Sequence, residues 1–211
     1  YLILRKYQVR NDLSKILTEN GFKNRTEHKK MLTLVRTACY IVIALLTGMR
    51  NSEIASLKCG AFYKNIGWDN EEYCWLKGLT YKLETEPKPA KWMVPDIVEI
   101  AINHLTRISS QYGRFIERSL KFLEPNEAHK QQKMQDCLFL TKDYKTNTYG
   151  VLSNQHFNKS LSDYANTFDL NTYDSNNDLD LPSNNIWMLR SHQFRRTFAC
   201  LAARSALGDL R

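Results

Sequence analysis

The sequence predicts a mainly helical α+β domain that carries a small β-hairpin. Three observations predict this fold class. The 211 residues are 43% hydrophobic and 25% charged, as in ordinary globular proteins with a buried core. Four stretches repeat apolar residues every three or four positions, which is the period of one helix face. Between the first two of them the period changes to two, which is the period of a β-strand.

The first long helix is expected to begin after Asn24 and to end at Gly48. Asn24, with Glu27 three residues later, has the form of a capping box. A short helix from Glu53 to Lys58 is expected next, with Ser52 as its N-cap and Gly60 at its end. These two helices would hold Arg50 in the tight turn between them. The apolar stripe of the long helix is Met31, Val35, Ala38, Val42 and Leu45.

The period of two runs from Tyr73 to Val94, and its positions are rich in β-forming residues. A polar, proline-bearing stretch at residues 84–89 divides it, which predicts two strands of a hairpin. After Pro95, a capping signature at Asp96 and Glu99 predicts a second long helix. The apolar stripe expected on that helix is Val98, Ala101, Leu105, Ile108, Tyr112 and Phe115.

A short strand is expected at residues 137–141, followed by a helix that Ser153 opens. A long surface loop at residues 169–185 is expected next, because it is rich in Asp and Asn. Its acidic run is similar to the start of a calcium loop, but Leu179 and Asn185 replace the required Gly and Glu, so no metal site is expected. The apolar stripe expected on the helix after Ser153 is Phe157, Leu161, Tyr164 and Phe168. The run in the loop that is similar to a calcium loop is Asp174, Asn176 and Asp178.

The last helix is expected from Ser191, its N-cap, to Ala206. At about 100° per residue, one face carries cations and the opposite face carries apolar side chains for the core. His192 then lies in the first turn, where a helix N-terminus favours a bound anion. The cationic face is His192, Arg195 and Arg196, and the apolar face is Phe194, Phe198 and Leu201.

Charge and cysteine content narrow the class of protein. The net charge is +8, and residues 1–50 alone hold ten basic and three acidic side chains, which indicates a polyanion as partner. Five cysteines without paired spacing are expected to be reduced, buried thiols. The longest apolar run, residues 38–46, is too short to cross a membrane, and no signal peptide is evident. We therefore expect a cytoplasmic protein with no membrane partner.

Two segments of the sequence contain the candidate residues for binding an anion. Arg50 directly follows a buried helix, and Glu53 is placed to orient its guanidinium group. His192 and Arg195, at i and i+3, present two donors to one object, and a phosphate diester uses both. Taken alone, the first segment has the alternative of a purely structural Arg–Glu ion pair, and the second has the alternative of a solvated basic face. Their occurrence together in one basic chain favours a phosphate site.

Three segments, TGMRNSEIASL, KWMVP and SHQFRRTFA, resemble in this order the landmarks of the tyrosine recombinase (phage integrase) catalytic domain. The resemblance spans Thr47 to Ala199 and implies a recombinase catalytic domain over residues 24–211, preceded by a linker or first helix at 1–23. It also implies site-specific recombination on double-stranded DNA, by a tetramer and without metal or cofactor. Such a protein would be nucleoid-associated when bound to DNA.

The resemblance further implies a role for each residue of the site. Arg50 and Arg195 would clamp the scissile phosphate, Glu53 would hold Arg50, and His192 would assist proton transfer. A hairpin lysine would protonate the departing 5′ oxygen, with Lys82 ranked before Lys88. Lys88, Lys91 and Arg196 would also contact backbone phosphates.

One departure from the family pattern matters. The family's nucleophilic tyrosine follows the His and Arg motif, yet all eleven tyrosines lie at or before Tyr173. We therefore expect a fragment that lacks the nucleophile, is inactive alone and can remain monomeric. Alternatives are a non-enzymatic DNA-binding module on the same scaffold, a helical protein-interaction domain and a type IB topoisomerase.

Overall fold

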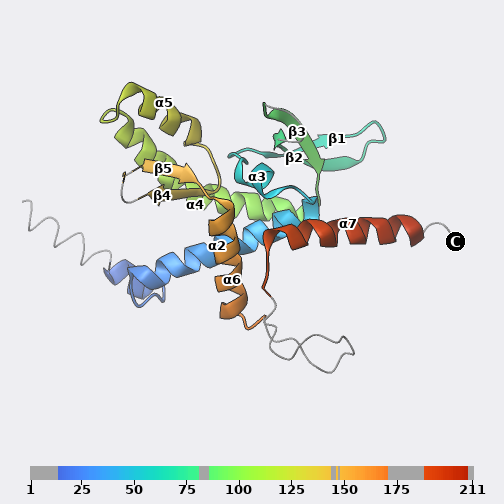
Figure 1. Ribbon diagram of the computed structural model, residues 1–211, viewed down its shortest axis with the longest axis horizontal. Helices are drawn as coiled ribbons and strands as arrows, with labels where there is room; N and C mark the ends of the chain where they lie inside the picture. The colour runs from blue at the N-terminus through green and yellow to red at the C-terminus, as the bar shows by residue number, and fades with distance from the viewer. Residues whose placement is uncertain (1–13, 81–85, 144–145, 147, 171–187, 209–211) are drawn as a thin grey trace, which may run out of the picture.

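The computed structural model describes residues 14–80, 86–143, 146, 148–170 and 188–208, with side chains through residue 205. Helix α2 (Arg25–Thr47) runs through the centre of the molecule (Figure 1). Helices α4 (Ile97–Leu120), α6 (Asn154–Thr167) and α7 (Ser191–Gly208) pack against it. Two small antiparallel sheets complete the fold, so the predicted α+β class is confirmed.

Both predicted ends of α2 are confirmed. The Asn24 side chain accepts hydrogen bonds from the backbone N–H groups of Thr26 and Glu27, each at 2.9 Å, and Gly48 ends the helix with a φ of 60°. The Glu27 carboxylate, however, accepts from the backbone of Lys23 rather than from that of Asn24. By length and composition alone α2 could cross a membrane, but here it is the central helix of the core.

Helix α3 (Asn51–Ala55) is shorter than predicted and begins two residues earlier, so the prediction of Ser52 as its N-cap is wrong. Arg50 occupies the N-cap position, and its backbone N–H donates to the Glu53 carboxylate at 2.6 Å. This bond satisfies a backbone group at the helix start, which otherwise lacks an intrahelical partner. The arginine is therefore fixed at the boundary between the turn and the helix.

The predicted hairpin is part of a three-stranded sheet with the order β1–β2–β3. Strands β2 (Glu72–Thr80) and β3 (Lys88–Met93) are the predicted pair, and β1 (Phe62–Ile66) is an additional edge strand. In the register, Leu76 is opposite Trp92 and Thr80 is opposite Lys88. Because strand side chains alternate and Leu76 is fully buried, these four residues share the face turned toward the core.

A strand forms near the predicted residues 137–141, but it begins three residues later and ends two residues later than predicted. Strand β4 (Leu140–Asp143) pairs with β5 (Thr148–Val151), whereas Cys137 forms only an isolated bridge with Lys58. Helix α5 (Pro125–Met134) and β5 were not predicted. They lie beside a second, smaller core, which is made of Ile116 of α4, Cys137, Leu140 of β4 and Tyr149 of β5.

The remaining helices form where predicted, but their apolar stripes are only partly buried. In α6, Ser153 is the N-cap as expected, and Phe157 and Leu161 are buried. Phe115 of α4, Phe168 beyond α6 and Leu201 of α7 were expected in the core, yet each is more than half exposed. Leu201 is exposed because the second half of α7 extends beyond the body of the protein (Figure 1).

Candidate functional site

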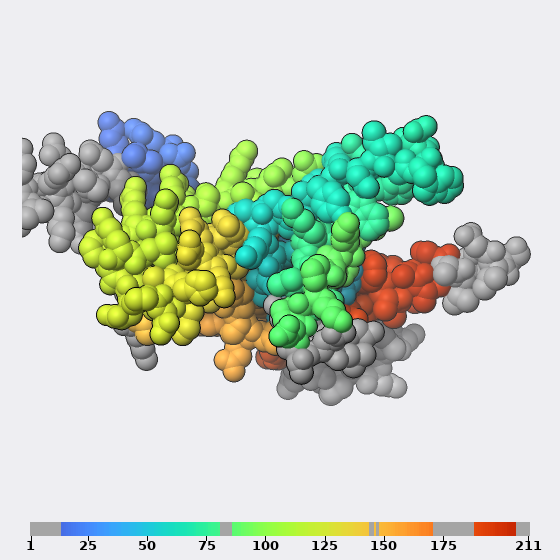
Figure 2. All heavy atoms as spheres, turned by 90° about the horizontal axis from the view of Figure 1, so that it is seen from above, coloured from blue at the N-terminus to red at the C-terminus, as the bar shows by residue number. Residues whose placement is uncertain are grey.

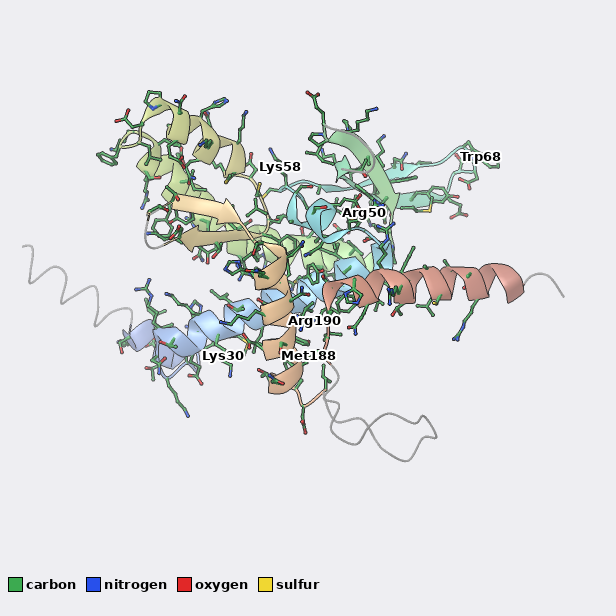
Figure 3. All side chains as sticks on the ribbon, in the orientation of Figure 1. Lys30, Arg50, Lys58, Trp68, Met188 and Arg190 are labelled. Carbon is green, nitrogen blue, oxygen red and sulfur yellow. The ribbon has the colours of Figure 1, made fainter. Side chains whose placement is uncertain are left out.

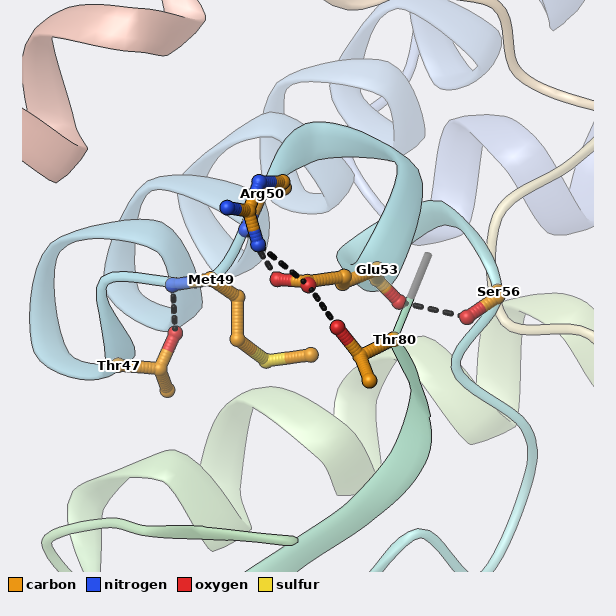
Figure 4. A network of polar contacts seen from close by, with 6 residues as sticks. All are labelled: Thr47, Met49, Arg50, Glu53, Ser56 and Thr80. Carbon is orange, nitrogen blue, oxygen red and sulfur yellow. Dashed lines mark hydrogen bonds and ion pairs between the residues drawn. The ribbon is translucent and has the colours of Figure 1, made fainter. Parts of the chain in front are cut away.

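The turn between α2 and α3, residues 47–53, is held by a network of polar contacts (Figure 4), and we call it the arginine turn. The Arg50 guanidinium donates to Glu53 Oε1 at 3.1 Å, and the Thr80 hydroxyl donates to the same oxygen at 2.7 Å. The Glu53 side chain is only 3% exposed, whereas that of Arg50 is 37% exposed. Glu53 thus anchors one edge of the guanidinium group and leaves another edge accessible to a ligand.

The backbone of the arginine turn is equally well fixed. The Thr47 hydroxyl donates to the carbonyl oxygen of Ile43 at 2.7 Å and accepts from the backbone N–H of Met49 at 3.1 Å. The Asn51 side chain donates to that of Asn154, which joins the turn to the first residue of α6. Arg50 therefore projects from a rigid base, as binding of an anion without reorganisation requires.

Helix α7 packs directly onto the arginine turn. A Cβ atom added to Gly48 would lie 2.5 Å from Cδ1 of Phe198, so the Phe198 ring covers this glycine. Arg195 lies one helical turn before Phe198. The cationic face of α7 is exposed, and among the described residues no side chain of His192, Arg195 or Arg196 forms an ion pair or a hydrogen bond. A ligand could use the donors of this face without first breaking an internal contact.

The start of α7 differs in detail from the prediction, because Ser191 is not its N-cap. The Gln193 side chain accepts from the backbone N–H of Arg190 at 2.7 Å, and the backbone N–H of Ser191 donates to Asn158 of α6 at 3.0 Å. The Ser191 side chain lies close to the Tyr40 hydroxyl. Burial raises the pKa of Tyr40, and with 2% exposure this tyrosine is a core residue rather than a nucleophile.

The hairpin lysines fall on opposite faces of the sheet. Lys88 begins β3 opposite Thr80, on the face that the Thr80 hydroxyl shares with Glu53. Lys91 is on the other face, where its Nζ lies 5.9 Å from the centre of the Tyr63 ring. Lys82, ranked first in sequence, lies outside the described residues. Of the two described lysines, Lys88 is thus the one on the side of the arginine turn.

Only part of the predicted set is joined by polar contacts. Arg50 and Glu53 form an ion pair, while in the described part of the chain no hydrogen bond joins Arg50 to His192 or Arg195. Sequence reasoning missed Thr80, although its place at the end of the core-facing positions of β2 was a usable signal. Within the described ranges, no group of three or more His, Cys, Asp or Glu residues is arranged to hold a metal ion.

No protein-family model and no curated protein matches this sequence. Among solved structures, the chain is similar to the XerH site-specific recombinase bound to its palindromic difH substrate in a post-cleavage complex. The TM-score is 0.41, with 19% identity over 87% of this chain and 42% of the recombinase. A pre-cleavage complex of XerH with difH gives a TM-score of 0.39 with 18% identity, over 86% and 42% of the two chains. The chain thus spans less than half the length of these recombinases.

Proposed function

We propose that this chain binds double-stranded DNA and supplies the phosphate-holding cations for strand cleavage and rejoining in site-specific recombination. The observation that carries the proposal is the anchored Arg50 guanidinium in a turn that packs against α7 through Phe198. A buried carboxylate that fixes an arginine while leaving part of it exposed is suited to hold an anion. The tyrosine recombinase motifs in the sequence supply the identity of the reaction.

In this proposal, Arg50 and Arg195 neutralise the non-bridging oxygens of one scissile phosphate. His192 assists proton transfer, and a hairpin lysine protonates the leaving oxygen. Lys82 remains the first choice from sequence, and the position of Lys88 on the face of the arginine turn supports it as the second. Because negative charge builds on the non-bridging oxygens in the transition state, each fixed donor should contribute about 3 kcal/mol, or about a hundredfold in rate.

The first experiment asks whether Arg50 and Arg195 share one phosphate. DNA affinity is measured over a range of salt concentrations for Arg50→Ala, Arg195→Ala and the double variant. Two residues that hold one diester should be coupled, so the loss in the double variant should differ from the sum of the single losses by more than about 0.5 kcal/mol. Lys91 lies on the opposite face of the hairpin, so the loss of affinity in Lys91→Ala should simply add to the loss in Arg50→Ala. Strict additivity of the Arg50 and Arg195 losses would refute the shared phosphate.

The second experiment tests the chemistry. A chain extended past Arg211 is trapped on a nicked suicide duplex, and covalent protein–DNA product is measured. Arg50→Ala should lower the cleavage rate about a hundredfold. Cleavage that survives unchanged contradicts the proposed role. Full DNA binding with no cleavage in any extended chain would instead support a non-enzymatic DNA-binding module.

A further inference from the structure

The end of the β1–β2 hairpin, residues 66–72, consists of the connecting loop and one strand residue on each side of it, and it exposes two apolar side chains. Trp68 is 97% exposed and Ile66 is 70% exposed. Figures 2 and 3 show this hairpin extending away from the body, with Trp68 at its end. Three acidic residues follow the tryptophan in the sequence, namely Asp69, Glu71 and Glu72. We call residues 66–72 the hairpin tip, and its charge makes it a poor match for DNA.

The hairpin tip is well ordered by its own hydrogen bonds. The backbone N–H of Gly67 donates to the carbonyl oxygen of Glu71 at 2.8 Å, and that of Glu71 donates to the Asp69 carboxylate at 3.1 Å. The Tyr73 hydroxyl donates to the other oxygen of Asp69. Trp68 is thus presented from a fixed loop, which lowers the entropy cost of using it as an anchor.

Helix α4 offers a surface of complementary chemistry. At about 100° per residue, the side opposite its buried stripe carries three exposed arginines, with the exposed Phe115 beside them. Phe122, which is also exposed, lies two residues after the end of the helix. The two acidic residues of the helix, Glu99 and Glu117, lie about 80° from Arg107 on one side, and Phe115 lies about 80° from it on the other side. Among the described residues none of the three guanidinium groups has an ion-pair partner. Four residues of the helix and one residue of the turn that follows it make up what we call the α4 outer face: Arg107, Arg114, Phe115, Arg118 and Phe122.

We propose that two copies of this chain associate head to tail, with the hairpin tip of one bound on the α4 outer face of the other. Arginine and aromatic residues are enriched at protein interfaces, and tryptophan and arginine dominate their binding energy. The carboxylates of Asp69 and Glu71 complement the arginines of α4, whereas Glu72 forms an ion pair with Lys64 of its own chain at 3.2 Å. Phe115 and Phe122, which is 80% exposed, supply apolar area for Trp68 and Ile66. This inference stands independently of the proposed function.

A contact between two different surfaces makes a distinctive prediction for mixtures. Sedimentation velocity of the 211-residue chain should show concentration-dependent association at chain concentrations up to about 1 mM, the range of weak complexes. Trp68→Ala and Arg114→Glu/Arg118→Glu should each weaken it by about thirtyfold, as expected for central anchors. An equimolar mixture of these two variants should form one-to-one dimers, because one intact tip and one intact α4 face remain.

Matched controls separate the contact from general changes of surface. Phe168→Ala removes another exposed aromatic ring, and Lys130→Glu/Lys133→Glu makes the same change in net charge on α5, so neither should alter association. A chain that stays monomeric, or variants that fail to pair when mixed, would overturn the proposal. If Arg114→Glu/Arg118→Glu instead lowers DNA affinity and leaves sedimentation unchanged, the α4 outer face is a nucleic-acid surface and the proposal is wrong.

Discussion

The arginine turn and the cationic face of α7 present positive charge in two different ways. Arg50 is anchored by a buried carboxylate that accepts three hydrogen bonds, from two groups of Arg50 and from Thr80. Arg195 and His192 are exposed, and within the described residues they have no polar partner. The first region is therefore preorganised by the fold, while the second must be ordered by its ligand. Substitutions in the first should cost stability, and those in the second should cost binding alone.

Glu53→Ala should have the largest effect on stability. It leaves the Arg50 guanidinium, its backbone N–H and the Thr80 hydroxyl without their acceptor in a site where Glu53 is 3% exposed. Breaking a buried ion pair from one side typically costs about 3–5 kcal/mol of unfolding free energy. Urea denaturation followed by circular dichroism measures this loss.

Glu53→Gln is the control, because it keeps the size and shape of the Glu53 side chain. It keeps one acceptor oxygen but loses the charge, so its unfolding free energy should lie between those of the original protein and Glu53→Ala. A loss below about 1 kcal/mol for Glu53→Ala would show that the arginine turn is not held as described.

Gly48→Ala should have the second-largest effect, because Gly48 joins the two regions. Its φ of 60° disfavours any Cβ, and the added atom would lie 2.5 Å from the Phe198 ring. Backbone strain of about 1 kcal/mol and overpacking of about 1–3 kcal/mol should add. Gly60→Ala is the matched control, because its φ is 74° and no atom lies within 4 Å of the added Cβ.

Thermal and urea unfolding of the two glycine variants should therefore differ. Gly60→Ala should lose about 1 kcal/mol and Gly48→Ala about 2–4 kcal/mol. The excess should shrink in a Phe198→Ala background, where the clash is removed. Equal losses at both glycines would contradict the packing of α7 on the arginine turn.

Thr80→Val should have a smaller effect, because it removes one of the three donors to Glu53 without changing the volume much. The expected loss of unfolding free energy is about 1–2 kcal/mol, and Thr80→Ser should restore most of it. Thr18, whose hydroxyl donates to a backbone carbonyl at an exposed position, is the control. Thr18→Val should change unfolding by less than about 0.5 kcal/mol. A Thr80→Val loss no larger than this would exclude a structural link between the hairpin and the arginine turn.

The four long helices α2, α4, α6 and α7 could be predicted from sequence because their signals are local, whereas α5 was missed. Asn24 and Gly48 mark the ends of α2 by cap chemistry that needs no partner from elsewhere in the chain. The Arg50–Glu53 pair was likewise predictable, because its two members lie three residues apart. Local spacing thus identified the Arg50–Glu53 ion pair of the arginine turn.

What the sequence missed depends on contacts between distant segments. Strand β1 forms only by pairing with β2, and Thr80 meets Glu53 across 27 positions of the chain. The apolar face of α7 was correctly placed at Phe194, which is buried, but Leu201 has the same helical phase and is 53% exposed. Periodicity gives the side of a helix that is apolar, whereas burial also requires another element beside it. That information lies in the tertiary arrangement.

Arg195→Ala should have the smallest effect on stability and a clear effect on binding. Because Arg195 is exposed and has no polar partner among the described residues, its loss should change the unfolding free energy by less than about 0.5 kcal/mol. If it contacts a DNA phosphate, affinity should fall about thirtyfold, from a lost charged hydrogen bond of about 2 kcal/mol. The slope of log affinity against log salt should also decrease by about 0.9.

Arg204→Ala is the control for this last prediction, because Arg204 lies on the same helix about 180° around from Arg195. Both substitutions remove one positive charge from an exposed position of α7, so a general electrostatic effect on DNA would be similar for both. A face-specific contact requires the loss at Arg195 to exceed the loss at Arg204 by about tenfold or more. Equal losses would mean that α7 attracts DNA only through its total charge. Arg195 would then not hold a specific phosphate, and Arg50 alone would remain as a phosphate-binding arginine.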